Sequence, residues 1–204
     1  MTLSPLPPAF YDRPAPAVAR ELLGMRLVRR LDGQRLAGII LEAEAYLGEE
    51  DQACHARAGR TPRTAVMYGP PGRTYVYFTY GMHWMLNCVT GRQDEPAAVL
   101  IRSIWPVEGL AQILHNRHNL PLDRCCDGPA KLCQALAIDR RLNGVDLTQS
   151  QEDLWIEPGQ PLPDSWVTIG PRVGISSVPE PWLSMPWRYL ACPPQGWNPA
   201  SPQE

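Results

Sequence analysis

The sequence predicts a single α+β domain with a curved, mostly antiparallel sheet, short flanking helices and a protruding β-hairpin. A chain of 204 residues suits one domain, and two domains would fit only if both were small. Hydrophobic residues make up 44% of the chain and charged residues 20%, which is usual for a globular protein and excludes disorder throughout. Proline and glycine number 23 and 16, and this abundance indicates many loops rather than a helical bundle.

The first elements along the chain are predicted to be a helix and a hairpin. Pro14–Leu23 has the pattern of a short helix, and Gly24 follows it as a terminator. Two apolar-rich runs come next, Met25–Leu31 and Arg35–Tyr46, and the Asp32-Gly33 pair between them is a signal for a tight turn. We therefore expect two paired antiparallel strands directly after the helix.

A second hairpin is predicted near the middle of the chain. The segment before it, Glu49–Gly72, is long, polar and interrupted by prolines, and a connection of this length within a compact domain is usually functional. Thr74–Thr79 and Trp84–Thr90 are predicted as the two strands, with Tyr80-Gly81-Met82 near the tip. Ala97–Trp105 then has the composition of a buried strand.

The rest of the chain has no internal repeat and no low-complexity linker. We therefore expect one domain over residues 1–204, with its core at about 15–192 and a loose tail at 193–204. Short helices are predicted at Gly109–Arg117 and Pro129–Ile138, the second with proline in its first turn. Further strands are predicted at Leu154–Ile156, Val167–Ile175 and Trp187–Ala191.

No segment has the features of a membrane span or a secretory signal. The longest unbroken apolar stretch, around Ala97–Ile101, is far shorter than the roughly 20 residues that a bilayer requires. Met1–Phe10 contains prolines and has neither a basic cluster nor a long apolar core. We therefore expect no membrane partner, and a location in the cytoplasm, with the nucleoid, or in the nucleus, rather than secretion.

Charge is distributed unevenly along the chain. The net charge of −2 by itself argues against a nonspecific nucleic-acid binder. Between Gln52 and Gln93, however, there is no Asp or Glu, although the window contains Arg57, Arg60, Arg63, Arg73 and Arg92. This run is either an ordinary solvated surface or a surface that faces phosphates, and both interpretations stay open at this point.

Two carboxylates and a phenol are expected on one face of the strand predicted at Arg35–Tyr46. Side chains alternate across a strand, so Glu42, Glu44 and Tyr46 share a face, with about 6–7 Å between neighbours. From spacing alone, these acids fit the solvated face of an edge strand. They are followed directly by the arginine-rich segment that carries His55, and a carboxylate in such a setting is suited to activating a water molecule.

Aromatic side chains are concentrated around the second predicted hairpin. Tyr68, Tyr75, Tyr77 and Tyr80 fall close together, and rings on such a hairpin can all belong to the core. Tyr80, however, lies at the tip beside Gly81, where burial is difficult. A large ring at a tip, flanked by arginines, is suited to stacking against bases or wedging between them.

A metal site is a further possibility in the sequence. His115 and His118 stand at helical spacing and are followed by Cys125, Cys126 and Cys133. The chain has no Cys-x2-Cys pair, and the spacing matches no common zinc finger. Reduced, partly buried thiols are the favoured interpretation, so we expect neither a metal nor a cofactor, and structural zinc is the alternative.

Several segments carry a specific resemblance to a known family. They are Leu41–Gly48 (LEAEAYLG), His55, Thr61-Pro62-Arg63, Tyr75–Met82 (YVYFTYGM), Asn87, Leu100–Arg102 and Gly128–Ala135 (GPAKLCQA). In this order they resemble the alkyladenine DNA glycosylase family, which removes 3-methyladenine and related damaged purines. The similarity extends from about Leu22 to Leu190, nearly the whole chain.

The resemblance implies a role for each matching residue. Glu44 matches the general base that activates the attacking water, and Arg102 matches a residue that helps to hold this water. The base pocket would be formed by Tyr46, His55 and Tyr77, whose rings sandwich the extruded purine and attract a cationic base, and by Asn87, which disfavours guanine. DNA would be contacted by Tyr80 as the intercalating side chain, by Met67 at the kinked step, and by Arg60, Arg63 and Lys131 at phosphates.

The resemblance thus implies a monofunctional glycosylase that flips alkylated or deaminated purines out of double-stranded DNA and acts as a monomer in base excision repair. The alternative is a noncatalytic nucleic-acid-binding module, in which Glu44 is solvated and Tyr80 only stacks. Lys131 is the only lysine of the chain, and its position at a helix start indicates a phosphate contact rather than an amine nucleophile, so no strand-cutting activity is expected.

Overall fold

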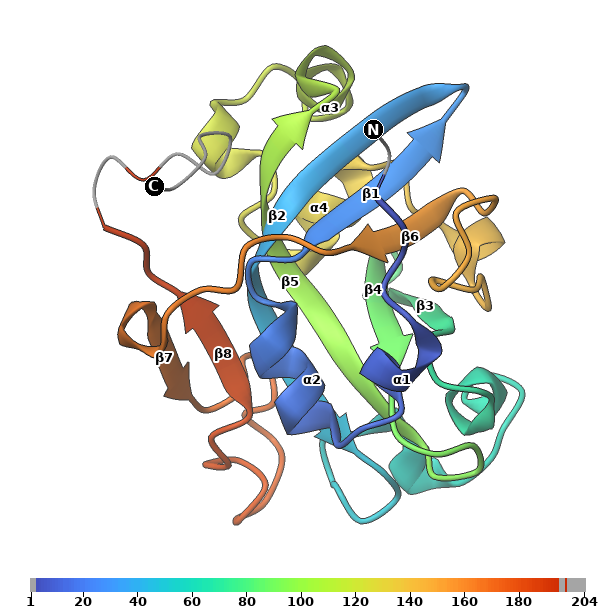
Figure 1. Cartoon of the computed structure of the whole chain (residues 1–204). Coiled ribbons are helices and arrows are strands. Elements are labelled where there is room, and N and C mark those ends of the chain that lie inside the picture. Colours follow the sequence, from blue (N-terminus) through green and yellow to red (C-terminus); the bar gives the residue numbers. More distant parts are fainter. Residues whose placement is uncertain (1–2, 195–196, 198–204) are drawn as a thin grey trace.

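The computed structural model describes residues 3–194 and residue 197, and these form one domain around a single twisted sheet (Figure 1). In the described part, every strand is antiparallel to its neighbours and the helices are short, which confirms the predicted α+β class. Most of the tail predicted at 193–204 lies outside the described residues.

The sheet has a main path in the order β3-β4-β5-β2-β1-β6. The strands are β1 Arg26–Leu31, β2 Gln34–Leu47, β3 Thr74–Thr79, β4 His83–Val89, β5 Ala97–Glu108, β6 Leu154–Glu157, β7 Val167–Gly170 and β8 Arg188–Ala191. The first half of β2 pairs with β1, and its second half pairs with β8, which also pairs with β7. Because β5 pairs along the other side of β2, these two long strands form the centre of the sheet.

The acids of β2 therefore do not lie on an edge strand. Glu44 is fully buried and Glu42 is almost so, and the register between β2 and β5 shifts on both sides of Glu42. Such irregularities re-aim side chains and are frequent next to active sites. The interpretation of these carboxylates as a solvated face is wrong, because β8 and β5 cover both sides of this half of β2.

Short helices pack on the sheet. They are α1 Pro8–Tyr11, α2 Ala15–Leu22, α3 Leu110–Asn116 and α4 Pro129–Ala135, with 3-10 turns η1 His55–Ala58, η2 Ala65–Tyr68, η3 Leu122–Arg124, η4 Arg140–Leu142 and η5 Asp164–Trp166. Helix α2 packs on β2 and β5, and α4 packs on β4 and β5. Buried side chains of both helices, such as Val18 and Leu132, belong to one hydrophobic core with the sheet.

Most predicted elements are present, with four main differences. Strand β5 continues to Glu108, beyond the predicted end at Trp105. The strand predicted at Val167–Ile175 ends at Gly170, because Pro171 has no N–H to donate to a ladder. The helix predicted at Pro129–Ile138 ends at Ala135, and Ala137, with φ 51°, adopts the left-handed conformation that is common after a helix. Helix α1 was not expected from the sequence.

The hairpin β3–β4 ends in a tight turn that presents an exposed ring. Tyr80 has φ 51° and Gly81 has φ 67°. Glycine adopts this left-handed region freely, whereas other residues pay roughly 1–2 kcal/mol. Tyr80 is nevertheless 79% exposed and Met82 is 68% exposed, so packing does not explain why a bulky residue is held there.

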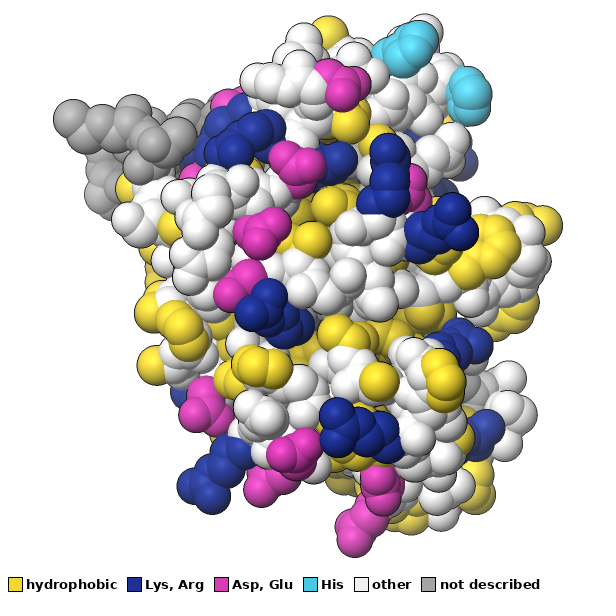
Figure 2. Space-filling model, turned by 90° about the vertical axis from the view of Figure 1, so that its right-hand side faces the viewer, with side chains coloured by type: hydrophobic (Ala, Val, Ile, Leu, Met, Phe, Trp, Pro, Cys, Tyr) yellow, Lys and Arg dark blue, Asp and Glu magenta, His cyan; other side chains and the backbone are white. Residues whose placement is uncertain are grey.

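Figure 2 shows the side of the molecule that lies on the right in Figure 1, where β3 is found. Basic and acidic side chains are interspersed on this face, and hydrophobic side chains are visible between them. Part of the arginine-rich run is paired, since Arg60 lies 3.5 Å from Asp94 and Arg73 lies 3.3 Å from Asp146. None of the helices in the described part is long and apolar enough to cross a membrane.

Candidate active site

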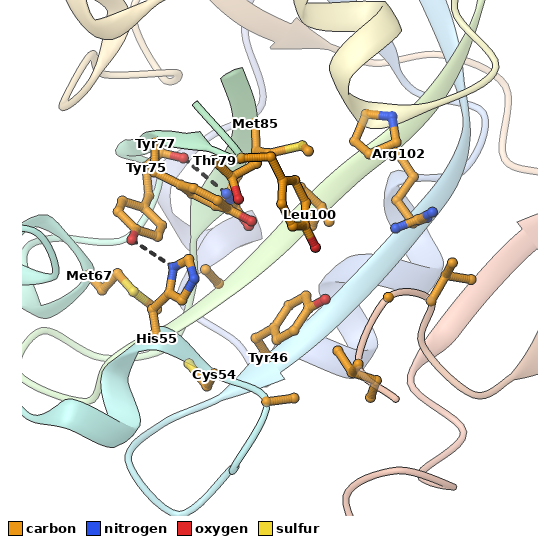
Figure 3. Close-up of a pocket in the computed structure, with 18 residues that line it drawn as sticks. Tyr46, Cys54, His55, Met67, Tyr75, Tyr77, Thr79, Met85, Leu100 and Arg102 are labelled. Carbon is orange, nitrogen blue, oxygen red and sulfur yellow. Dashed lines mark hydrogen bonds between the residues drawn. The ribbon is translucent and has the colours of Figure 1, made fainter. Parts of the chain in front are cut away.

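A cavity of about 290 Å³ lies between the second half of β2, the hairpin β3–β4 and the segment that follows β7 (Figure 3). Its lining is largely aromatic and apolar, with a few polar groups. The lining residues are Tyr46, Ala53, Cys54, His55, Met67, Tyr75, Tyr77, Thr79, Tyr80, Met85, Asn87, Ala98, Leu100, Arg102, Pro129, Val173, Gly174 and Ile175. The residues predicted for the base pocket, Tyr46, His55, Tyr77 and Asn87, are thus brought together.

Glu44 lies directly behind the wall of this cavity. Its Oε1 accepts a hydrogen bond from the backbone N–H of Val173 at 2.7 Å. Its Oε2 accepts from the hydroxyl of Tyr46 at 2.9 Å and from Nη1 of Arg102 at 3.2 Å. All three donor residues line the cavity, while the Glu44 side chain itself is fully buried, so they separate the carboxylate from the open space.

Burial raises the pKa of Glu44 above its ordinary value. The charge of Arg102, the N–H of Val173 and the hydroxyl of Tyr46 favour the ionised form, but they do not cancel the desolvation. Burial and the neighbouring Glu44 charge also raise the pKa of Tyr46, so its hydroxyl stays protonated and donates. A carboxylate with a raised pKa is a better proton acceptor, as a general base requires.

Arg102 connects the two acids of β2. Its Nε donates to Oε1 of Glu42 at 3.0 Å while its Nη1 contacts Glu44. Arg188 of β8 donates to the same Glu42 oxygen at 2.5 Å. Burial opposes the charge on Arg102, but Glu44 and Glu42 outweigh it and raise the pKa of the guanidinium. Glu42 therefore holds Arg102 in place, and Arg102 stays charged beside Glu44.

Aromatic rings form two opposite walls of the cavity. In Figure 3, Tyr46 lies on one side, and Tyr75, Tyr77 and His55 are grouped on the other. The ring centroids of His55 and Tyr77 are 4.5 Å apart and nearly perpendicular, and those of Tyr75 and Tyr77 are 5.3 Å apart. A flat ligand between the walls can stack on one side and meet ring edges on the other.

The polar groups of the pocket are held in fixed orientations. The hydroxyl of Tyr75 lies 2.9 Å from Nδ1 of His55, and Nδ2 of Asn87 donates to the backbone carbonyl of Tyr75 at 3.0 Å. Burial, followed by the charges of Arg63 and Arg57, lowers the pKa of His55 to about 4. The imidazole is therefore neutral at neutral pH.

The residues predicted to contact DNA are distributed around the pocket rather than gathered in it. Tyr80 lines its rim, while Arg60 and Arg63 are exposed on the segment between β2 and β3. Lys131 is outside the lining and pairs with Asp127 at 2.7 Å.

Met67 does not fit the contact with a kinked DNA step that the resemblance implied. Its side chain is only 2% exposed, because it packs with Cys54, Tyr68 and Tyr75 in a small satellite core. The same packing makes Met67 part of the pocket lining.

The contribution of the segment after β7 was not expected from the sequence. Arg172 is fully buried and pairs with Asp51 through two hydrogen bonds of 2.5 and 2.9 Å. This pair fixes the next residue, Val173, beside Glu44, although the two residues are far apart in the chain. A buried arginine needs an acidic partner, but no local pattern indicates which acid that is.

The histidines and cysteines of the possible zinc site do not assemble. Cys125, Cys126 and Cys133 are buried free thiols. Within residues 3–194 and 197, no group of three or more His, Cys, Asp or Glu side chains is arranged so that it could hold a metal ion. The side-chain positions therefore give the zinc alternative no support.

Comparison with known proteins identifies the family. A family model described as methylpurine-DNA glycosylase (MPG) matches residues 9–193. A relative from Myxococcus xanthus is 48% identical over 183 residues, which covers 90% of this chain and 88% of the relative. Relatives from Methanocella arvoryzae and Carboxydothermus hydrogenoformans are both 45% identical and cover 90% of this chain, with 90% and 93% of their own lengths aligned. All three are provisionally named 3-methyladenine DNA glycosylase. The resemblance that the motifs carry is confirmed, and this chain belongs to the methylpurine-DNA glycosylase family.

Proposed function

We propose that this protein flips an alkylated or deaminated purine out of duplex DNA and hydrolyses its N-glycosidic bond with a water activated by Glu44. Membership of the family makes it a DNA glycosylase, a hydrolase of N-glycosyl bonds with a role in DNA repair. The glycosidic carbon cannot be reached inside a stacked duplex, so the nucleotide must leave the stack before the bond is cleaved.

One observation carries the proposal: a buried, ionisable carboxylate lies behind the wall of an aromatic pocket. The cavity volume of about 290 Å³ is close to the lower end of the range for small-ligand sites, which suits a single flat base. Tyr46 links the pocket to the carboxylate, because its ring lines the pocket and its hydroxyl donates a hydrogen bond to Glu44. A base stacked on Tyr46 therefore places its glycosidic bond near the carboxylate.

The proposed chemistry uses the charge and the basicity of Glu44. When the base departs with the bonding electrons, positive charge develops on the sugar, and a nearby carboxylate stabilises it. Water then supplies the oxygen that bonds to the sugar, and Glu44 takes the proton. The three donors separate the carboxylate from the cavity, and we assign the approach of this water to the side of Arg102, whose contact is the longest of the three at 3.2 Å.

Tyr80 is proposed to fill the space that the flipped nucleotide leaves in the duplex. Its exposed ring stands at the rim of the pocket, at the tip of the hairpin β3–β4, which is the position that such a wedge needs. Arg60 and Lys131 are proposed to contact phosphates around the lesion. Each is paired with an exposed acid, Asp94 or Asp127, and these weak surface pairs can exchange for phosphate oxygens.

The direct test is base release from duplexes that each contain one lesion. Duplexes with 3-methyladenine, 7-methylguanine, hypoxanthine or ethenoadenine are incubated with the purified protein, and the free base is measured by chromatography. The proposal expects release of at least one of these bases and an intact abasic strand. Tight binding to all of them without release would instead support a noncatalytic binding module.

The raised pKa of Glu44 leads to an expected pH dependence. Release needs the ionised carboxylate, so the rate should increase with pH through the pKa of Glu44 and reach a plateau above it. Because burial raises this pKa, the acidic limb should lie above the ordinary glutamate value of about 4.3. Single-turnover rates on 7-methylguanine are suitable, since a cationic base needs no further proton to leave. A rate that is flat from about pH 4 to pH 8 would contradict the role of Glu44.

Lys131→Ala is expected to weaken DNA binding without changing the reaction product. Enzymes that also cut the strand form a Schiff base through an amine, but Lys131 lies outside the pocket lining and is engaged by Asp127. Loss of one phosphate contact should lower the dependence of log affinity on log salt by about one unit. Lys131→Arg should restore binding, and a borohydride-trapped adduct that disappears in Lys131→Ala would overturn this expectation.

A further inference from the structure

Each of the two aromatic walls of the pocket has an arginine over one of its rings. The guanidinium carbon of Arg172 lies 4.7 Å from the ring centroid of Tyr46. The guanidinium carbon of Arg63 lies 5.2 Å from the ring centroid of Tyr77, on the opposite wall. Neither arginine lines the cavity, so each acts on the pocket through a ring that does. A cation over one face of an aromatic ring repels, and polarises the π system against, a second cation that approaches the opposite face.

The two arginines differ in how their charge is balanced. Arg172 is fully buried and its charge is matched by Asp51 through two short hydrogen bonds. Arg63 is exposed, and among the described residues no carboxylate lies within ion-pairing distance of it. On the side of Tyr77, the positive charge next to the pocket wall therefore has no carboxylate partner in the described part of the chain.

The charge of Arg63 is expected to act on His55 of the same wall. After burial, Arg63 is the largest cause that disfavours the protonated imidazole. His55 and Tyr77 form the same wall, with their ring centroids 4.5 Å apart. A positive charge on a bound base would be disfavoured by the same interaction.

We propose that Arg63 is a specificity-determining residue that lowers the preference of the pocket for positively charged purines relative to neutral ones. This inference rests on the proposed function, because it concerns the base that is bound between Tyr46 and Tyr77. It differs from a phosphate contact of Arg63, which would act equally on every lesion in the same duplex.

The charge of the base identifies the step at which Arg63 acts. Cleavage of the glycosidic bond transfers about one unit of positive charge from base to sugar, whether the base starts as a cation or as a neutral group. Arg63 therefore assists departure of both kinds of base to a similar extent. Arg63 distinguishes a cationic base from a neutral one when the base enters the pocket. Its effect on selectivity should therefore change kcat/KM and leave the saturated single-turnover rate unchanged.

The experiment is a competition between two lesions in one tube. Duplexes of identical flanking sequence contain 7-methylguanine, a cation, or hypoxanthine, which is neutral, and the ratio of their initial release rates gives the ratio of kcat/KM. At about pH 6.5, 7-methylguanine keeps its N1 proton and its positive charge, and His55, whose pKa burial lowers to about 4, is neutral. Arg63→Gln is expected to raise the ratio of 7-methylguanine to hypoxanthine release by about three- to ten-fold, which lies within the range for one cation–π interaction.

Arg60→Gln is the matched control. Arg60 is an exposed arginine of the same segment and also lies over a tyrosine ring, with its guanidinium carbon 5.4 Å from the centroid of Tyr68. Tyr68 is not part of the pocket lining, so this variant should weaken release of both bases equally and leave the ratio unchanged. Arg63→Lys keeps the charge and should keep the ratio within about two-fold of the original.

Two results would overturn the inference. One is an unchanged ratio in Arg63→Gln, together with equal losses for both lesions, which is the behaviour of a phosphate contact. The other is an equal rise in Arg63→Gln and Arg60→Gln, which would assign the effect to the general surface charge. If the unaltered protein releases neither base, the proposed function itself is contradicted. This result is distinguishable, because it concerns release by the unaltered protein and not the ratio in the variants.

Discussion

Glu44→Gln is expected to lower the rate of base release by about 10²- to 10⁴-fold while leaving binding to lesion-containing DNA intact. The substitution keeps the shape of the side chain but removes its charge and its ability to accept a proton. Both properties are required, because the carboxylate stabilises positive charge on the sugar and takes the proton from water. Single-turnover release and affinity for a duplex with an abasic analogue measure the two effects separately.

The surroundings of Glu44 require a control for folding. Its oxygens accept from Val173, Tyr46 and Arg102, so the amide group of a glutamine must face at least one donor. A mismatch of this kind typically costs about 1–3 kcal/mol of folding stability, so thermal unfolding of each variant should be recorded and assays kept well below the transition.

Glu42→Gln is the matched comparison for Glu44→Gln. Glu42 lies two residues away on the same strand and holds Arg102, but unlike Glu44 it makes no hydrogen bond with Tyr46 or Val173 of the pocket lining. It should therefore reduce release by no more than about ten-fold, through the position of Arg102. If Glu42→Gln abolishes release and Glu44→Gln does not, the general base has been assigned to the wrong acid.

Tyr80→Ala is expected to weaken the flipped complex by about ten- to a hundred-fold, which corresponds to the loss of one stacked ring. The ring stands 79% exposed at the hairpin tip and contributes little to the core, so folding should be retained. The loss should be largest for well-paired lesions, since an unpaired base leaves the stack at lower cost. A fluorescent base analogue at the lesion position reports the extruded fraction directly.

Met82→Ala provides the comparison for the hairpin tip. Met82 is 68% exposed on the same turn but does not line the pocket, so its removal should have a small effect that does not depend on pairing. Tyr80→Phe should behave like the unaltered protein, because stacking needs the ring and not the hydroxyl. Equal losses on paired and unpaired lesions in Tyr80→Ala would identify Tyr80 as an ordinary packing residue.

Much of the site was predictable because its residues lie close together in the sequence. Period-two alternation placed Glu42, Glu44 and Tyr46 on one side of a strand, and the same rule placed Tyr75 and Tyr77 together on another. The turn at Tyr80 followed from its glycine and from the flanking strands. The resemblance to a family then assigned roles that alternation alone does not contain.

The sequence by itself thus determined the class of fold and the strands that carry the site, because these depend on local patterns of a few residues, and the family resemblance named part of the pocket lining. Only the tertiary structure decided how Glu44 is enclosed, since its contact with Val173 joins residues that are 129 positions apart. The pair of Arg172 with Asp51 spans 121 positions, and the places of Arg63 and Arg172 over opposite walls depend on the same long-range packing. Burial, pKa and charge balance are properties of such distant contacts, because they depend on which groups replace water around a side chain, and no local pattern of residues specifies that.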